Sequence, residues 1–343
     1  MSLRDRIDSG LNGDYQGLWN GFHRLNDYLF NIQKGVKTLI GGDSGTYKTT
    51  LVDYMVQSAI EDAERKGIDL EIVYNSWEID KISKQCNWLS NRIFTKYGIT
   101  ISPSKIKGLG DLRLNKDEQL LVNSELEYIE MIFDKIKFNF TPTNPTGMYY
   151  QMWKLGESKG KFEYEDYQDK DGNTKQKIKK YIPYNSKAIT WMITDHNYYY
   201  RKERGFETKE VMDKASEYIV ELSNTLGQTF TSIHQFNDGL SAIDRQKFKG
   251  VDLSPQKSDF KDTRNFYQDS DICLGILCPK KVDLQTSLGY DVNKLGKRFL
   301  HLKVMKNRLE EDGLAIGLFV DPKSGTFREL PKPTEINYKE YEC

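Results

Sequence analysis

One stretch of nine residues restricts the fold of this 343-residue chain more than any other feature. An apolar segment at residues 36–40 reads as a strand, and a helix-period segment begins near Leu51. Loop N–H groups and the positive end of a following helix form a cradle for phosphate oxygens. The sequence therefore predicts a P-loop that binds ATP and Mg²⁺, formed by Gly42, Asp43, Ser44, Gly45, Thr46, Tyr47, Lys48, Thr49 and Thr50.

Within this loop the residue types assign separate tasks. Lys48 is expected to contact the terminal phosphates, and the Thr49 hydroxyl is expected to bind Mg²⁺. Tyr47 stands where the pattern has its last glycine. A side chain is tolerable there if the residue already has helical backbone geometry, so this departure weakens the P-loop assignment without cancelling it. The alternative is an ordinary turn between a strand and a helix.

Apolar segments recur along the chain and alternate with helix-period stretches. Two helices are clear, at residues 51–63 and 211–226, and Gly67 and Gly227 are placed to end them. This alternation predicts an α/β fold with a mostly parallel, twisted sheet flanked by helices. The expected strands are at residues 36–40, 70–74, 188–194, 229–234, 272–277, 299–305 and 314–320.

Residues 161–181 read as a polar β-hairpin inserted where the pattern otherwise requires a crossover. If Gly172 and Asn173 form a two-residue turn, opposite charges pair across the ribbon. The other interpretation is a solvated surface excursion with no chemistry. The expected partners are Asp166 with Lys179, Glu165 with Lys180, and Tyr167 with Ile178.

Composition excludes several classes of protein. Lysine plus arginine total 50 and aspartate plus glutamate total 50, so any binding of nucleic acid must come from local patches. The four cysteines lack metal-ligand spacing and are expected to be reduced thiols. No apolar run approaches about 18 residues, and the N-terminus lacks the apolar stretch of a signal peptide. We therefore expect a cytoplasmic protein with no membrane contact.

Polar side chains follow three of the expected strands. Glu78 comes after the strand at 70–74, where its carboxylate can take a proton from an attacking water. Asp195 follows the strand at 188–194 and suits Mg²⁺ held through waters. Gln235 follows the strand at 229–234, as an amide able to sense the γ-phosphate. Because carboxyl ends of parallel strands meet at one edge, these groups are expected around the P-loop.

With these residues in place, the sequence resembles the C-terminal ATPase domain of DnaB-type replicative helicases, from about residue 10 to residue 329. The P-loop and the strand-end residues carry part of this resemblance. Departures are Tyr47, His234 in place of serine, the hairpin insertion and the extra residues 309–312. The other matching motifs are Gly17-Leu18-Trp19-Asn20-Gly21, Leu25-Asn26, Ser76-Trp77-Glu78, His234-Gln235-Phe236-Asn237, Pro255, Ser258-Asp259-Phe260, Gln268-Asp269-Ser270-Asp271 and Lys306-Asn307-Arg308.

The resemblance implies a RecA-like ATPase domain at residues 31–330, after an N-terminal arm at 1–30 and before a C-terminal tail at 331–343. It implies that Glu78 is the catalytic glutamate, that Asp195 is the Mg²⁺-associated aspartate, and that a neighbouring subunit inserts Lys306 and Arg308 against the γ-phosphate. A homo-oligomer in the form of a hexameric ring is the matching assembly. Only a short arm precedes the domain, so the family's helical N-terminal domain is not expected, and primase or loader contact stays open.

The resemblance also implies loops that bind single-stranded DNA after Asp195 and after Gln235. The first mixes three tyrosines with cations, as a surface that stacks bases and follows a phosphate backbone would. The alternative is a pair of solvated loops whose tyrosines pack on the core. The expected DNA-binding residues are Arg201, Lys202 and Arg204 in the first loop and Arg245, Lys247 and Lys249 in the second.

Together these features predict an ATP-driven translocase on single-stranded DNA that unwinds duplex DNA, in the cytoplasm of a bacterium or a phage-infected host. Two alternatives stay open at the level of sequence. One is a RecA-type recombinase or loader ATPase that does not unwind DNA. The other is a nucleotide-binding assembly protein with poor turnover.

Overall fold

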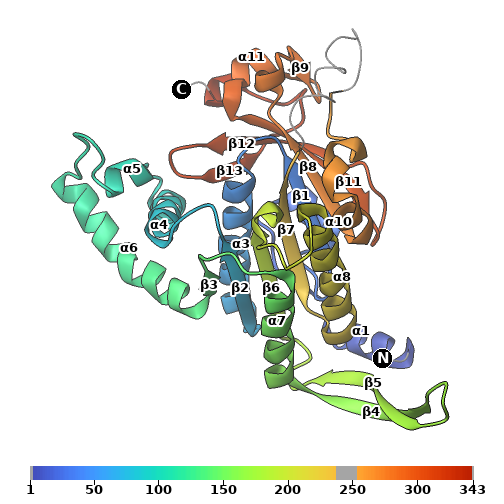
Figure 1. Ribbon diagram of the computed structural model, residues 1–343. Coiled ribbons are helices and arrows are strands. Elements are labelled where there is room, and N and C mark those ends of the chain that lie inside the picture. The colour runs from blue at the N-terminus through green and yellow to red at the C-terminus, as the bar shows by residue number, and fades with distance from the viewer. Residues whose placement is uncertain (1–2, 237–252, 342–343) are drawn as a thin grey trace.

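The computed structural model describes residues 3–236 and 253–341, and a nine-stranded sheet runs through its centre (Figure 1). The strand order is β13-β12-β11-β8-β1-β7-β6-β2-β3. The strands from β3 to β8 in this order are parallel, and β11, β12 and β13 continue the sheet in antiparallel pairs. The strands are β1 (Lys37–Gly42), β2 (Leu70–Ser76), β3 (Lys137–Asn139), β6 (Ile189–Asp195), β7 (Thr229–Gln235), β8 (Ile272–Leu277), β11 (Phe299–Asn307), β12 (Ala315–Asp321) and β13 (Thr326–Glu329).

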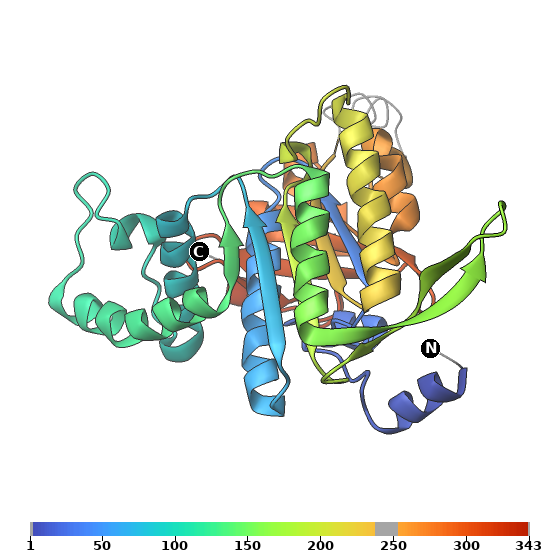
Figure 2. The ribbon, with the colours of Figure 1, turned by 60° about the horizontal axis from the view of Figure 1, so that its bottom comes forward.

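Helices cover both faces of the sheet, because successive residues of a buried strand point to opposite sides. On β1, Ile40 packs in the core shared with α3 and α4, whereas Leu39 packs in the core shared with α7 and α8. Figure 2 shows α7 and α8 side by side on one face, with α4 to α6 beyond β3. The helices are α2 (His23–Leu29), α3 (Lys48–Lys66), α4 (Lys81–Tyr97), α5 (Pro103–Ile106), α6 (Lys116–Lys135), α7 (Pro145–Lys159), α8 (Thr208–Leu226), α10 (Arg264–Asp269) and α11 (Val292–Leu295).

The α/β fold class and each of the seven expected strands are confirmed. Both expected helices are present, and both end at the expected glycine in the left-handed conformation, with φ of +64° at Gly67 and +68° at Gly227. The short strands β3 and β13 and the helices α4, α6 and α7 were not among the expected elements. No helix within the described ranges is long and apolar enough to cross a membrane.

The inserted hairpin is present as β4 (Gly160–Gln168) and β5 (Thr174–Pro183), but the expected pairing between its strands is wrong. Glu165 faces Lys177, Asp166 faces Gln176 and Tyr167 faces Lys175. The reason is a longer loop, which Asp169 closes by accepting the N–H groups of Asp171 and Asn173 at 3.0 and 2.9 Å. Opposite charges still pair in the new register, with 3.0 Å between Lys177 Nζ and Glu165 Oε1.

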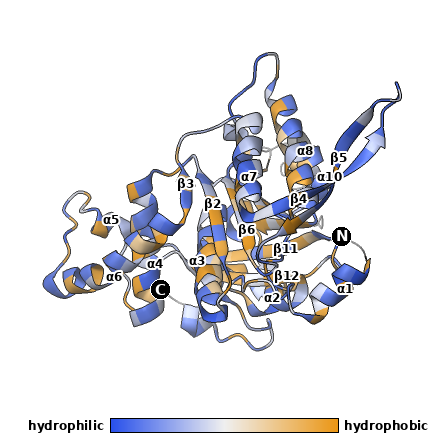
Figure 3. Ribbon diagram, turned by 90° about the horizontal axis from the view of Figure 1, so that it is seen from below, coloured by the Kyte–Doolittle hydropathy of each residue, from blue (hydrophilic) through white to orange (hydrophobic). Residues whose placement is uncertain are grey.

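The two ends of the chain differ in how they pack. Helix α1 (Leu3–Leu11) has no buried residue, whereas Leu18, Phe22 and Leu25 are buried in the main core. Near the C-terminus Tyr341 packs on Phe319 of β12, with ring centroids 5.0 Å apart. Figure 3 shows apolar residues concentrated on the central strands, whereas the β4–β5 hairpin is mostly hydrophilic.

A buried ion pair connects α3, the helix that follows the P-loop, with α4, and a hydrogen bond connects it with β2. Lys84 of α4 is fully buried, and its Nζ lies 2.8 and 3.0 Å from the two carboxylate oxygens of Asp53 on α3. The hydroxyl of Tyr74 on β2 donates to the same carboxylate at 2.8 Å, and Lys84 Nζ stands 4.2 Å from the centre of the Tyr74 ring. Each charge therefore has its partner inside the core.

Removing this cation is expected to cost much more stability than removing an exposed one. Lys84→Met leaves the Asp53 charge buried without its partner, a change worth roughly 3–5 kcal/mol in other proteins. Lys81→Met, at an exposed position of the same helix, should stay within about 0.5 kcal/mol of the parent. Urea unfolding measures both. The double variant Asp53→Leu/Lys84→Met should recover part of the loss, and a Lys84→Met cost equal to that of Lys81→Met would contradict the assignment.

Candidate nucleotide and magnesium site

The predicted site residues meet at the carboxyl edge of the parallel strands. The P-loop joins the end of β1 to the start of α3. Pairing in register brings Gln235 of β7 beside Gly42, and Asp195 of β6 beside Ser76 at the end of β2. Glu78 follows Ser76 by two residues. The expected convergence at one edge of the sheet is therefore present.

The P-loop is held closed by contacts on one of its own carbonyl groups. The Asp43 carbonyl oxygen accepts hydrogen bonds from the Thr46 hydroxyl at 2.8 Å and from Lys48 Nζ at 2.7 Å. Gly42 permits this closure, because a Cβ there would lie 2.7 Å from Thr46 Oγ1. Gly45 has a φ of +65°, which glycine adopts without steric cost. Lys48 thus lies folded over the loop that it is expected to serve.

Tyr47 has an unusual backbone conformation for a residue with a side chain. It stands directly before α3 with φ 62° and ψ 26°, which is left-handed and not the helical geometry that would make a side chain tolerable there. The reason is that the backbone passes from the loop into a right-handed helix through one residue in the left-handed conformation. In the usual pattern a glycine occupies this position and adopts that conformation freely. An L-residue with a Cβ is disfavoured there by roughly 1–2 kcal/mol. The Tyr47 ring offsets this cost by packing against the core on the α3 side of the sheet.

Asp195 provides a test of whether Mg²⁺ fits this site. The residue is 1% exposed, and burial raises the pKa of its carboxyl to about 6, against the influence of Lys84 and the Thr49 side chain. Thr49 is near enough to affect that pKa, yet neither Asp195 oxygen has a hydrogen-bond partner of good geometry among the described residues. A buried carboxylate with two unsatisfied oxygens beside a threonine hydroxyl fits a Mg²⁺ ion and its waters.

Glu78 is oriented by a histidine that the sequence analysis missed. His196 Nε2 lies 3.0 Å from Glu78 Oε1. His196 Nδ1 accepts the N–H of Tyr198 at 3.3 Å, so we assign the ring proton to Nε2, which donates to Glu78. This hydrogen bond is the main cause that lowers the pKa of Glu78, and Lys48 acts in the same direction. The only sequence signal for His196 is its position directly after Asp195.

Lys48 interacts electrostatically with both acidic groups. Burial lowers the pKa of its ammonium, and the carboxylates of Asp195 and Glu78 act in the opposite direction. His234 of β7 is buried nearby, and burial lowers its pKa to about 3, so its ring is neutral. The site therefore combines one half-buried cation with two carboxylates and a neutral histidine.

Lys306 and Arg308 lie at the opposite edge of the sheet from the P-loop. Strand β11 is antiparallel to β8, and Asn307 pairs with Ile272 at the start of β8. Arg308 donates to the Gln268 carbonyl at 2.7 Å. Lys306 Nζ donates to three carbonyl oxygens, those of Tyr267 at 2.9 Å, Gln268 at 2.7 Å and Ser270 at 2.6 Å. The structure therefore brings these two cations together, but not with Lys48.

The first expected DNA-binding loop keeps its cations but not its full aromatic surface. Arg201, Lys202 and Arg204 are exposed, and Lys202 pairs with the exposed Glu207 at 2.8 Å. The expectation of three tyrosine rings that stack on bases is wrong for two of them, because their rings pack inside the protein. Tyr200 is buried at 5% exposure with its ring edge-on to Trp77, and Tyr198 stacks on His234 with centroids 4.9 Å apart. Tyr199 is 44% exposed. Arg245, Lys247 and Lys249 lie outside the described residues.

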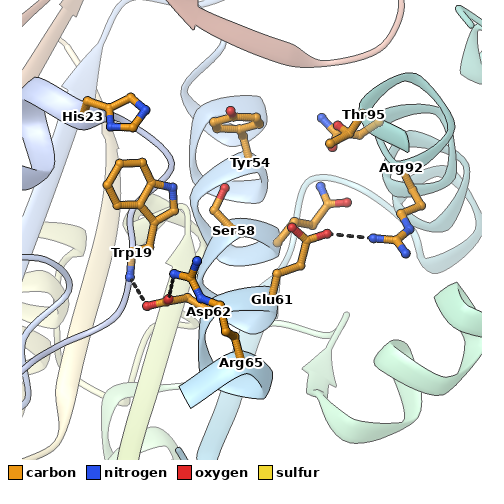
Figure 4. Close-up of a pocket in the computed structure, with 11 residues that line it drawn as sticks. Trp19, His23, Tyr54, Ser58, Glu61, Asp62, Arg65, Arg92 and Thr95 are labelled. Carbon is orange, nitrogen blue, oxygen red and sulfur yellow. Dashed lines mark hydrogen bonds and ion pairs between the residues drawn. The ribbon is translucent and has the colours of Figure 1, made fainter. Parts of the chain in front are cut away.

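A separate pocket of about 570 Å³ lies between the N-terminal segment, α3 and α4 (Figure 4). Its charged side chains already pair with one another: Glu61 with Arg92 at 2.8 Å, and Asp62 with Arg65. Asp62 also accepts the N–H of Trp19 at 2.8 Å. The pocket belongs to the flank of α3 and contains none of the predicted site residues.

A P-loop between a central parallel strand and its helix, with carboxylates at the ends of neighbouring strands, defines a P-loop protein with a RecA-like fold. No family model matches the sequence, and no curated protein matches it. Among solved structures, one described as an ATPase domain superposes with a TM-score of 0.67 at 14% identity, over 96% of each chain. A DnaB-like replicative helicase, described with its interactions with primase, gives 0.67 at 14% identity over 95% of this chain and 65% of its own. The resemblance to a DnaB-type RecA-like domain is confirmed for the fold.

The left-handed backbone conformation of Tyr47 can be tested with two variants that both lack the aromatic ring. At a left-handed position Tyr47→Gly should be more stable than Tyr47→Ala by roughly 1 kcal/mol. At a helical position the order would reverse, because alanine is favoured over glycine there by about 1 kcal/mol. Urea unfolding of the pair measures the difference, and the lost ring packing cancels between them. A more stable alanine variant would contradict the left-handed geometry.

Proposed function

We propose that this chain is an ATP-driven translocase on single-stranded DNA that unwinds duplex DNA. The observation that carries the proposal is the group formed by Lys48, Glu78, Asp195 and Gln235 at one edge of the sheet. The RecA-like fold, shared with an ATPase domain and with a DnaB-like replicative helicase, supports it.

Nucleotide binding is assigned to the P-loop. The N–H groups of residues 42–50 would hold the phosphates, and Lys48 would leave the Asp43 carbonyl to contact them. Thr49 and the unsatisfied carboxylate of Asp195 would hold Mg²⁺. The chemistry that Mg²⁺ would supply there is neutralisation of phosphate charge. Gln235, adjoining Gly42, is the residue that would report the γ-phosphate to the loop that follows.

Glu78 is the residue that would take a proton from the attacking water. The hydrogen bond from His196 fixes one of its oxygens, and the side chain is 35% exposed, so water can reach it. The lowered pKa keeps Glu78 ionised at neutral pH, as a proton acceptor must be. In this proposal His196 orients the Glu78 carboxylate, and Glu78 accepts the proton from the attacking water.

DNA contact is assigned to the exposed cations of the loop after Asp195. Arg201, Lys202 and Arg204 project from a chain with no net charge, so they form a local patch that can follow phosphates. The Tyr199 ring packs on His196 with centroids 4.6 Å apart and is 44% exposed, and its exposed part is proposed to stack a base. Arg245, Lys247 and Lys249 are proposed to add to this surface. We assign the protein to the cytoplasm and to a homo-oligomeric, ring-shaped assembly.

The role of Glu78 can be separated from binding. Glu78→Gln should bind ATP nearly as tightly as the parent, but its hydrolysis should fall by a factor of about 10² or more, because an amide cannot accept the proton. Direct nucleotide binding and phosphate release measure the two effects. Lost binding in this variant would make Glu78 a structural residue.

Strand separation tests the function itself. With ATP the parent protein should separate a forked duplex, and Glu78→Gln should not. ATP hydrolysis without strand separation would favour a recombinase or loader ATPase. Binding of ATP without hydrolysis by the parent would favour a nucleotide-binding assembly protein.

Arg308 is proposed to act on the nucleotide of a neighbouring subunit. Arg308→Ala should keep nucleotide affinity but lose most DNA-stimulated hydrolysis, since an arginine placed on a γ-phosphate accelerates such reactions by roughly 10³ to 10⁵. Mixing this variant with Lys48→Ala should restore some activity, because some interfaces then combine an intact Arg308 with an intact Lys48. Arg328→Ala, exposed on β13, is the control. No recovery in proven mixed assemblies would remove the role in trans.

A further inference from the structure

A second lysine contacts the P-loop from outside the strand-loop-helix unit. Lys281 belongs to the short helix at Pro279–Val282, which follows β8. Its Nζ donates to the carbonyl oxygens of Ser44 and Gly45, both at 2.9 Å. A Cβ at Gly45 would lie 2.6 Å from this ammonium, so the glycine also makes room for it.

The fold explains why Lys281, and not its neighbour, reaches the loop. Strand β8 lies beside β1, and Ile276 pairs with Gly42, so the residues after β8 emerge next to the P-loop. In the short helix at Pro279–Val282 the side chains of two adjacent lysines then have different partners. Lys280 donates to Asn293 Oδ1 at 2.8 Å, away from the loop. The sequence analysis missed Lys281 because nothing in the motif spacing links it to the P-loop.

Peptide geometry gives this contact a consequence for phosphate binding. A trans peptide unit is planar, and its C=O and N–H groups point in opposite directions. The Ser44 carbonyl shares a peptide unit with the N–H of Gly45, and the Gly45 carbonyl shares one with the N–H of Thr46. Both carbonyls are held toward Lys281. The two N–H groups are therefore held toward the other side.

We propose that Lys281 is a positioning residue of the P-loop, which orients the N–H groups of Gly45 and Thr46 toward the phosphates before a nucleotide binds. The inference rests on the proposed binding of ATP. Loop N–H groups contact the inner phosphates, which ATP and ADP share. Lys281 should therefore matter equally for the two nucleotides, unlike a cation that touches the γ-phosphate.

Three variants test this role. Lys281→Ala should weaken binding of Mg-ATP and of Mg-ADP by a similar factor, about tenfold, and raise KM while changing kcat less than about twofold. Lys281→Arg should restore most of the affinity, because guanidinium also donates to carbonyls. Lys280→Ala, which changes the charge equally but not the loop contact, should match the parent.

Amide hydrogen exchange of the nucleotide-free protein provides an independent readout. Exchange at Gly45 and Thr46 should be faster in Lys281→Ala than in the parent, and unchanged in Lys280→Ala. Equal exchange in parent and Lys281→Ala would overturn the inference, as would a loss of ATP affinity alone or an equal effect of Lys280→Ala. If the parent binds no nucleotide, the proposed function fails, and the exchange comparison still decides whether Lys281 orders the loop.

Discussion

The parallel alignment of β2, β6, β7 and β1 is the constraint on which the candidate site depends. Parallel strands place their carboxyl ends at one edge, so residues more than 150 positions apart, Glu78 and Gln235, follow strands that end together. The same alignment directs α3 back from that edge, so the N-terminus of α3, the positive end of the helix dipole, lies at the P-loop. A change in the direction of any one strand would move its functional residue to the other edge.

Charge balance is the second condition that the site must satisfy. Two carboxylates, Asp195 and Asp53, lie near each other inside the protein, and each raises the electrostatic cost of the other. Lys84 offsets this from within the core, because it pairs with Asp53 and also lowers the pKa of Asp195. Lys48 and Lys281 supply positive charge on the loop side. Asp195 is buried with no hydrogen-bond partner of good geometry among the residues that the structure describes, and a divalent cation would complete this part of the balance.

Sequence patterns predicted what depends on local order. Strand and helix positions, the helix stops at Gly67 and Gly227, and the carboxylates after strands all follow from short-range periodicity and turn chemistry. The errors came from effects that periodicity does not encode. The register of the hairpin depends on Asp169, which closes a longer loop than a two-residue turn. The left-handed conformation of Tyr47 depends on how the P-loop enters α3. His196 and Lys281 act through contacts that only the folded sheet creates.

Lys306 and Arg308 lie out of reach of the P-loop of their own chain. β1 has 6 residues, so its ends are roughly 20 Å apart, farther than a side chain reaches. In the single chain both cations serve structure, because they bind carbonyl groups at the end of α10 and before β8. Contact with a neighbour's phosphate would require them to give up some of these carbonyls. In the proposed assembly, insertion of Lys306 or Arg308 against a neighbour's phosphate would therefore cost hydrogen bonds that hold the turn between α10 and β8.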